Sequence, residues 1–366
     1  MAGSSYGNIF RITTWGESHG AGVGVVVDGC PAGLKLCEED IQKVLDRRKP
    51  GQSKYATPRN EADKAIIMSG VFEGLTTGTP ISILVENADQ HSKDYSNIAN
   101  SYRPGHADLT FDEKYGIRDY RGGGRSSGRE TIGRAAAGAV ALKVLNELGI
   151  YFITYARSIG PVTINEDNFD AGEITNNPFC MPDAEAAKKA GEFLDKCIED
   201  KDSSGGIIEC VITGMPAGIG DTVFDKLDAC LAKAVFSIGA VKGFEIGSGF
   251  NAAKMKGSEN NDPFYITADG KISKVTNNAG GILGGMSDAS PIVFRAAVKP
   301  TPSIARPQQT VTKDKTRTEI IIHGRHDPVI VPRAVVVVEC MAAIAITDLL
   351  LSNMGAKMSS LRDFYL

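Results

Sequence analysis

The chain has 366 residues, of which 42% are hydrophobic and 23% are charged, so it is long enough to bury a sizeable core without disulfides. Its 40 lysines and arginines against 44 aspartates and glutamates give a net charge of −4, which argues against a dedicated nucleic-acid-binding protein. No linker rich in Pro, Gly or Ser and no internal repeat divides the sequence. We therefore expect residues 1–366 to form a single large domain.

The cysteines and the apolar segments predict a location. The seven cysteines include no CxxC pair and no zinc-ligand spacing with histidine, so we expect no metal site and reduced, mostly buried thiols, as in a cytoplasmic protein. The N-terminus lacks the basic region and apolar core of a signal peptide. In the most apolar stretch, the uncharged run from Cys340 to Thr347 is far shorter than the roughly 20 residues that span a bilayer, so we expect no membrane association.

Hydrophobic periodicity predicts alternating elements along the chain. The expected elements, in order, are strand 22–28, helix 38–48, strand 80–85, helix 129–148, helix 183–200, strand 207–213, helix 224–236, strands 291–298 and 319–322, and helix 332–351. The small residues of helix 129–148 indicate close neighbours, and the nearly all-apolar helix that opens with Pro332 is expected in the core. This irregular order favours a mixed α+β sandwich over a doubly wound parallel sheet.

A first polar turn contains a histidine. Gly16 and Gly20 bracket Ser18 and His19, so a tight turn can present the imidazole to a cleft for proton transfer near neutral pH. A turn histidine bonded to a backbone carbonyl is the structural alternative. A second cluster, 46–54, closes the first helix with cations, and there the structural interpretation, stabilisation of the helix dipole, is the stronger one.

A longer segment, 103–131, combines arginines, glycines and hydroxyls. Five arginines fall between Arg103 and Arg129, and three consecutive glycines and a Ser-Ser pair precede a helix start. Backbone N–H groups, guanidinium groups and a helix N-terminus together suit a phosphate. A solvated basic loop is the alternative. The pattern is neither a dinucleotide-binding GxGxxG motif nor a Walker A loop.

A third region is split in the sequence. The Gly-rich loop 277–287 suits a flat ring laid on backbone, and Lys299 to Ser303 suit a phosphate tail, which together hint at a phosphorylated cofactor. Three of the five histidines, His19, His106 and His326, lie within these Gly- and Arg-rich segments. This coincidence indicates acid–base chemistry on a phosphorylated substrate.

Together these segments resemble the chorismate synthase family. The matching segments, collinear from Tyr6 to about Asp348, are 16–20, 28–31, 103–108, 124–131, 134–139, 299–303 and 325–328 running to Glu339. The resemblance implies a β-α-β sandwich, a homotetramer and the last step of the shikimate pathway. In that step 5-enolpyruvylshikimate 3-phosphate loses phosphate and a ring proton by 1,4-anti elimination to give chorismate. The family requires reduced FMN, although the reaction has no net redox change.

The resemblance also implies roles for individual residues. His19, His106 and Asp327 take the catalytic positions: one histidine keeps the reduced flavin suitably protonated and the other protonates the departing phosphate, with Asp327 as a proton relay. The implied flavin-site positions are Arg125, Ser126, Ser127, Gly239, Ala240, Gly284, Lys299, Pro300, Thr301, Pro302, Ser303 and Arg325. The implied substrate-binding positions are Arg48, Lys54, Arg103, Arg129 and Arg134. Position 54 is often Arg in the family, and Lys54 keeps the charge but loses the bidentate fork.

Other functions make different demands on the sequence. A flavin reductase would not need the arginines between Arg103 and Arg134, and a phospho-ligand-binding protein would not need His19, His106 and Asp327 in anion-rich segments. A nucleic-acid binder is disfavoured by the net charge and by the absence of interleaved aromatics. No long insertion indicates an added reductase module, so we expect NAD(P)H to act only indirectly, through a separate flavin reductase that supplies reduced flavin.

Overall fold

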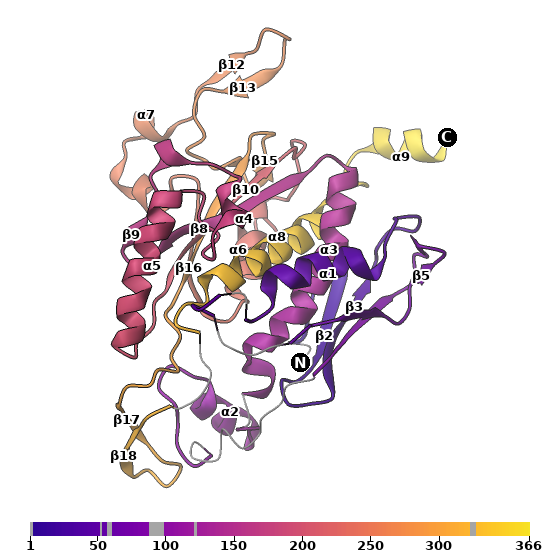
Figure 1. Ribbon diagram of the computed structural model, residues 1–366. Coiled ribbons are helices and arrows are strands. Elements are labelled where there is room, and N and C mark those ends of the chain that lie inside the picture. The colour runs from indigo at the N-terminus through magenta and orange to yellow at the C-terminus, as the bar shows by residue number, and fades with distance from the viewer. Residues whose placement is uncertain (1–2, 52, 57–60, 88–98, 121–122, 323–326) are drawn as a thin grey trace.

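The computed structural model describes residues 3–51, 53–56, 61–87, 99–120, 123–322 and 327–366, which form two main antiparallel sheets (Figure 1). The first has the strand order β1 (Ser5–Tyr6), β2 (Arg11–Gly16), β3 (Gly22–Asp28), β7 (Ile81–Glu86), β4 (Ala65–Ile67). The second has the order β11 (Val241–Ile246), β16 (Ile292–Val298), β10 (Gly206–Thr213), β8 (Tyr151–Ile159), β9 (Val162–Thr163). Alternating apolar side chains on β3, β7, β10 and β16 face the interior of the molecule.

A helical layer lies between the two sheets. It contains α1 (Glu38–Arg48), α3 (Thr131–Glu147), α6 (Leu227–Phe236) and α8 (Val331–Asn353). Helix α3 packs on β2, β3 and β7, while α8 packs on β8 and β10 and α6 on β11; α3 and α8 also pack on each other. The arrangement confirms the predicted mixed β-α-β sandwich.

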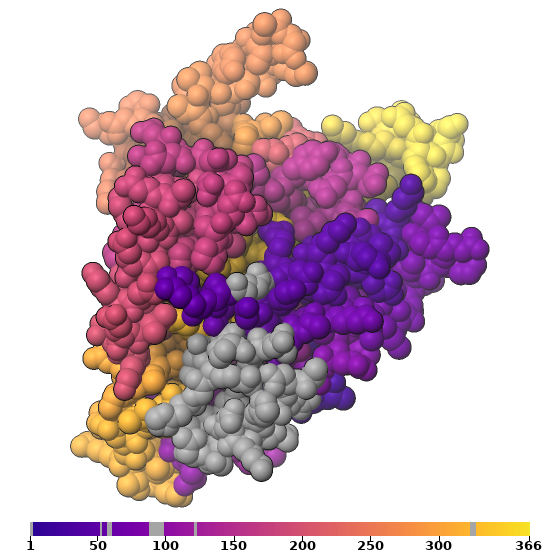
Figure 2. All heavy atoms as spheres, viewed as in Figure 1, coloured from indigo at the N-terminus to yellow at the C-terminus, as the bar shows by residue number. Residues whose placement is uncertain are grey.

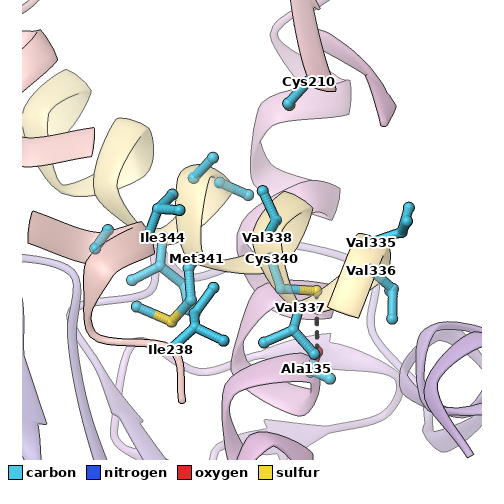
Figure 3. Packing of buried hydrophobic residues seen from close by; sticks show 14 of the residues in the cluster. Ala135, Cys210, Ile238, Val335, Val336, Val337, Val338, Cys340, Met341 and Ile344 are labelled. Carbon is cyan, nitrogen blue, oxygen red and sulfur yellow. Dashed lines mark hydrogen bonds between the residues drawn. The ribbon is translucent and has the colours of Figure 1, made fainter. Parts of the chain in front are cut away.

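Small residues allow α3 and α8 to approach closely. A Cβ atom built on Gly138 of α3 would lie 2.2 Å from the Cβ of Cys340 on α8. Figure 3 shows a second contact between these helices, the hydrogen bond from the Cys340 thiol to the Ala135 carbonyl oxygen, which is 3.7 Å long. On its sheet side, a Cβ on Gly133 would lie 2.9 Å from the Gly24 carbonyl oxygen of β3. The Gly- and Ala-rich composition of the predicted helix therefore serves two close contacts, as expected.

The remaining elements are shorter or lie at the periphery. They are β5 (Val71–Phe72), β6 (Leu75–Thr76), α2 (Asp108–Tyr115), α4 (Glu173–Asn176), α5 (Ala184–Glu199), α7 (Gly257–Asn260), β12 (Phe264–Ile266), β13 (Ile272–Lys274), β14 (Ile282–Leu283), β15 (Met286–Ser287), β17 (Gln308–Val311), β18 (Arg317–Ile320) and α9 (Met358–Tyr365). The β12–β13 hairpin and α9 project from the body of the protein (Figure 2).

Most predicted elements are confirmed, with shifted ends. The predicted helix 38–48 is α1, and the predicted strands 80–85, 207–213 and 291–298 are β7, β10 and β16 within one residue at each end. The helix predicted from residue 129 begins only at Thr131, because two 3-10 turns, Gly124–Ser126 and Gly128–Glu130, precede it. The helix predicted from 224 begins at Leu227, and the strand predicted at 319–322 lies two residues earlier.

The structure also tests the predictions made for the cysteines and for the longest apolar helix. All seven cysteines are free, but only Cys30, Cys210 and Cys340 are buried, so the prediction of mostly buried thiols was wrong for the other four. Helix α8 is long and apolar enough to cross a membrane by length and composition alone. Because 78% of its most apolar window is buried inside the protein, it is the core helix that the sequence predicts.

Candidate active site

A cavity of about 1500 Å³ opens where the helical layer meets the loops of both halves of the molecule. Its wall is formed by the N-terminal strands, α2, residues 123–134, the turn 237–242, residues 299–302 and the start of α8. Eleven of the predicted site residues line it: Arg48, His106, Arg125, Ser126, Ser127, Arg134, Gly239, Ala240, Lys299, Pro302 and Asp327. Segments far apart in the sequence thus meet at one cavity.

Backbone conformation shapes the loop that precedes α3. Gly123 and Gly124 adopt positive φ angles of 85° and 52°, a region that other residues rarely occupy. The loop then places Ser126 and Ser127 on the cavity wall. Arg125 donates hydrogen bonds to the Thr14 hydroxyl at 2.7 Å, the Thr14 carbonyl at 3.2 Å and the Gly16 carbonyl at 3.1 Å. The guanidinium of Arg125 therefore fastens the loop to β2, in addition to lining the cavity.

His106 connects two predicted segments. Its Nε2 lies 2.7 Å from the Ser303 hydroxyl, and Lys299 donates a hydrogen bond to the Gly105 carbonyl at 2.7 Å. Pro302 packs so closely on Gly105 that a Cβ there would lie 2.8 Å from the proline Cβ. The segment that carries His106 is thus held directly against residues 299–303, and His106 lies half-buried at the cavity.

A buried network contains two predicted arginines and two carboxylates. Arg48 forms a 2.7 Å ion pair with Asp63, and Arg129 pairs with both Asp63, at 3.2 Å, and Glu61. All four are buried. Burial, followed by the nearby charge of Arg333, lowers the pKa of Arg48 to about 10, while burial raises the pKa of Asp63. Arg48 lines the cavity, whereas Arg129 supports it from behind.

A second buried network anchors the start of α2. Asp108 accepts hydrogen bonds from Arg103 Nε at 2.8 Å and Nη2 at 2.7 Å, and pairs with Arg118 at 2.9 Å. Burial raises the pKa of Asp108, but the hydrogen bonds and charge of Arg103 outweigh it and lower this pKa to about 2. The alternative of a solvated basic loop is therefore wrong for Arg103, Arg118 and Arg129, which are buried in ion pairs.

Lysines gather at another part of the cavity wall. Lys233, Lys242 and Lys299 line it beside the turn that contains Gly239 and Ala240. Burial and the neighbouring Lys242 lower the pKa of Lys299. Among the described residues none of the three lysines forms an ion pair with a carboxylate; Lys299 donates to a carbonyl, and Lys233 lies 5.8 Å from the Tyr6 ring centroid. Their positive charge is therefore open to an anion in the cavity.

The start of α8 brings a carboxylate to the cavity. Asp327 forms a 2.8 Å ion pair with Arg333, and both side chains line the cavity. Nearby, Arg134 on α3 pairs with Glu130 at 2.8 Å and donates a hydrogen bond to the Ser237 hydroxyl. A carboxylate that can accept a proton and several cationic groups thus line the same cavity.

Other predicted residues are not on the described cavity wall. Arg103, Arg129 and Ser303 lie directly behind it, and Pro300 and Thr301 connect Lys299 to Pro302. His19 is half-buried, with Nδ1 3.2 Å from the Ser18 hydroxyl. Lys54 is exposed and pairs with Asp195 at 2.8 Å, and Gly284 lies in the β14–β15 turn. Arg325, and His326 with it, lie outside the described residues.

The sequence did not predict three cationic residues of the cavity wall, Lys233, Lys242 and Arg333. Lys242 follows the predicted flavin-site pair Gly239 and Ala240 almost directly, so its proximity was an available signal. Arg333 lies in the first turn of α8, where a cation opposes the helix dipole, which was a second signal. In the part of the chain that the structure describes, no group of three or more His, Cys, Asp or Glu side chains is placed to hold a metal ion.

Comparisons with known proteins identify the family of the chain. The family model described as chorismate synthase matches residues 10–351. A chorismate synthase of Agathobacter rectalis is 70% identical over 365 residues, covering 100% of this chain and 99% of the relative. One of Methanococcoides burtonii is 56% identical, covering 95% of this chain and 96% of the relative. A crystal structure of chorismate synthase has a TM-score of 0.75 at 31% identity, covering 98% of this chain and 96% of that one. The chain therefore belongs to the chorismate synthase family, the lyases that convert 5-enolpyruvylshikimate 3-phosphate into chorismate in the shikimate pathway.

Proposed function

We propose that this chain converts 5-enolpyruvylshikimate 3-phosphate into chorismate with reduced FMN bound beside the substrate in the 1500 Å³ cavity. The observation that carries the proposal is the meeting of His106, Asp327, the lysines and the loop before α3 at this one cavity. Pockets for one drug-sized ligand measure roughly 300–1,000 Å³, so this cavity has room for both molecules.

The lysines suit the flavin. FMN carries a phosphate, and Lys242 and Lys299 offer positive charge beside the turn 237–240, whose backbone also lines the cavity. Ser126 and Ser127 add hydroxyl groups on the same wall. We assign the flavin to this part of the cavity, with Gly284, Pro300 to Ser303 and Arg325 as the further flavin-site residues that the family pattern implies. Reduced FMN held by these residues would supply electron density to the allylic system of the substrate.

The histidines and Asp327 suit the proton transfers. The ring C–H bond and the C–O bond to phosphate both break, a new C=C bond forms, and the phosphate departs with the C–O electron pair. His106 contacts Ser303 of the flavin-site segment, so we place it at the flavin. There it would maintain the protonation state of the reduced flavin. The family pattern then leaves to His19, which is in the same turn as the wall residue Glu17, the donation of the proton to the departing phosphate. The carboxylate of Asp327 receives the ring proton.

The arginines suit the two carboxylates and the phosphate of the substrate. Arg48 and Arg134 line the cavity and contact the substrate directly in this proposal, while the buried pairs of Arg103 and Arg129 hold the surrounding backbone. Lys54 is the remaining substrate-site residue that the family pattern implies. We further propose one domain, a homotetramer in the cytoplasm, and a separate flavin reductase that uses NAD(P)H.

An anaerobic assay tests the function. Purified protein, chemically reduced FMN and 5-enolpyruvylshikimate 3-phosphate are mixed, and chorismate and phosphate are followed together. We expect equal amounts of both products without net flavin oxidation. Flavin binding without product would leave a flavoprotein with another substrate and contradict the proposal.

Two substitutions test the proton-transfer roles. His106→Ala and His19→Ala should each lower kcat at least about 100-fold, the range of a lost acid–base group. Melting temperature and FMN affinity measured on the same preparations should stay close to those of the unsubstituted protein. Near-normal turnover in both variants would overturn the assignment of the histidines.

A further inference from the structure

Arg333 occupies an unfavourable place in its helix. It is the third residue of α8, after Val331 and Pro332, and the first turn contains no acidic residue. The N-terminus of a helix carries a partial positive charge, so a cation there lowers the stability of the helix. An arginine at this position therefore has to be compensated by contacts elsewhere.

Two contacts provide this compensation and fix the guanidinium. Nη1 of Arg333 lies 2.8 Å from Oδ2 of Asp327, and Nε donates a 3.2 Å hydrogen bond to the carbonyl oxygen of Arg48. That carbonyl is at the C-terminal end of α1, where unpaired carbonyls favour a cation. Because one planar group makes both contacts, the position of Asp327 is tied to the end of α1 that carries Arg48.

The same pair faces the proposed reaction. Arg333 and Asp327 both line the cavity, with side chains 22% and 13% exposed. We propose that Arg333 is a positioning residue for the elimination. It holds the Asp327 carboxylate at the cavity and at a fixed distance from Arg48. The group that accepts the ring proton and the group that binds the substrate anions therefore keep a constant separation. This inference rests on the proposed function, which assigns the ring proton to Asp327.

A matched control exists on the same two helices. Arg47 neighbours Arg48 on α1 and forms a bidentate ion pair with Glu339 on α8, at 2.6 Å and 3.0 Å. It therefore also ties α1 to α8, but among the described residues its only ion pair is with Glu339, and it is not one of the residues that line the cavity. Arg47→Gln removes a tie between the helices and leaves the Asp327 contact in place.

The experiment compares Arg333→Gln, Arg333→Lys and Arg47→Gln in the anaerobic assay. Arg333→Gln should lower kcat about 10- to 100-fold, the cost of a displaced reacting group, with KM for the substrate within about threefold. Arg333→Lys keeps the charge and should recover part of the loss. Arg47→Gln should lower the melting temperature but leave kcat within about twofold.

Two further measurements separate positioning from a structural role. In the Asp327→Asn background, Arg333→Gln should cost less than about threefold in kcat, because the group it positions is already lost. Guanidinium at a non-denaturing concentration should restore part of the kcat of Arg333→Ala. An equal loss in both backgrounds, or normal kcat in folded Arg333→Gln, would overturn the inference and leave the proposed function standing. Absence of turnover in the unsubstituted protein would overturn both, and if Arg333→Gln fails to fold, the Lys variant gives the same comparison.

Discussion

Two cationic regions of the molecule differ in how their charge is balanced. The arginine network, Arg48, Arg103, Arg118 and Arg129, is buried against Asp63, Asp108 and Glu61. The lysine cluster, Lys233, Lys242 and Lys299, lines the cavity without a carboxylate partner among the described residues. In the sequence the arginines form the more conspicuous anion-binding pattern. In the structure most of their charge is neutralised, so they chiefly organise the wall, and the lysines offer the more open charge.

The largest effect is expected from removing a counter-ion in the arginine network. Asp108→Asn leaves Arg103 and Arg118 buried without their shared carboxylate, which should lower the free energy of unfolding by about 3–5 kcal/mol. Chemical denaturation followed by circular dichroism measures the change. Asp202→Asn is the control, because Asp202 pairs with Arg306 at the surface and should cost less than about 1 kcal/mol. Equal changes in the free energy of unfolding would show that a buried ion pair of this network contributes no more to stability than an exposed one.

A second test uses pH. The folded pKa of Asp108 is about 2, below its ordinary value of 3.8, so its ionised form stabilises the fold. This stabilisation, about 2 kcal/mol, is fully present above pH 4 and is lost as the pH falls from about 4 to about 2. The free energy of unfolding of Asp108→Asn should therefore fall less steeply than that of the unsubstituted protein over this window. Parallel pH profiles would contradict the assigned pKa.

Local patterns account for much of what the sequence predicts. The spacing of Ile41, Val44 and Leu45 predicts α1 correctly, and the Gly- and Ser-rich run before Thr131 predicts part of the cavity wall. Both signals lie within a few neighbouring residues. The α2 helix and the β8 strand were not predicted, since neither shows a clear period in the sequence.

The balance of charge could not be predicted in the same way. Asp63 is 15 residues from Arg48 and 66 residues from Arg129, so the pairings exist only through the fold. Lys233 on α6 and Lys242 on β11 have no motif around them in the sequence, and of the three cavity lysines only Lys299, directly after β16, was predicted. A count of cations along the chain therefore identifies the region of the site but not which of them remain available to a ligand.

The lysine cluster gives a moderate expected effect on ligand binding. Lys242→Ala removes one unneutralised charge and should weaken FMN binding about tenfold, or about 1.4 kcal/mol, the loss of one charge-assisted contact. Riboflavin lacks the phosphate, so its affinity should stay unchanged, and added salt should reduce the difference between the variants. Flavin fluorescence titration measures both ligands. Lys271→Ala, on the projecting β12–β13 hairpin, is the control for a general loss of charge.

An equal loss of riboflavin and FMN affinity would show that Lys242 shapes the cavity without recognising phosphate. A different result would be unchanged FMN affinity in Lys242→Ala and weaker FMN binding in Arg48→Lys. The charge available to the flavin phosphate would then come from the arginine network and not from the lysine cluster. Either result would relocate the flavin phosphate.

The smallest effect is expected at the exposed cation that departs from the family pattern. Lys54 pairs with Asp195 at 2.8 Å, and its Nζ lies 4.7 Å from the Tyr55 ring centroid, outside the described cavity wall. Lys54→Arg introduces the guanidinium fork that the family resemblance implies at this position, and that fork can bind the same carboxylate at two points. Because Asp195 competes for the side chain, KM for the substrate should fall by less than about threefold, with kcat and melting temperature unchanged. A tenfold fall in KM would mean that the side chain of residue 54 breaks its pair with Asp195 to bind the substrate. An exposed cation would then contribute to substrate binding, which the comparison of the buried arginines with the cavity lysines does not predict.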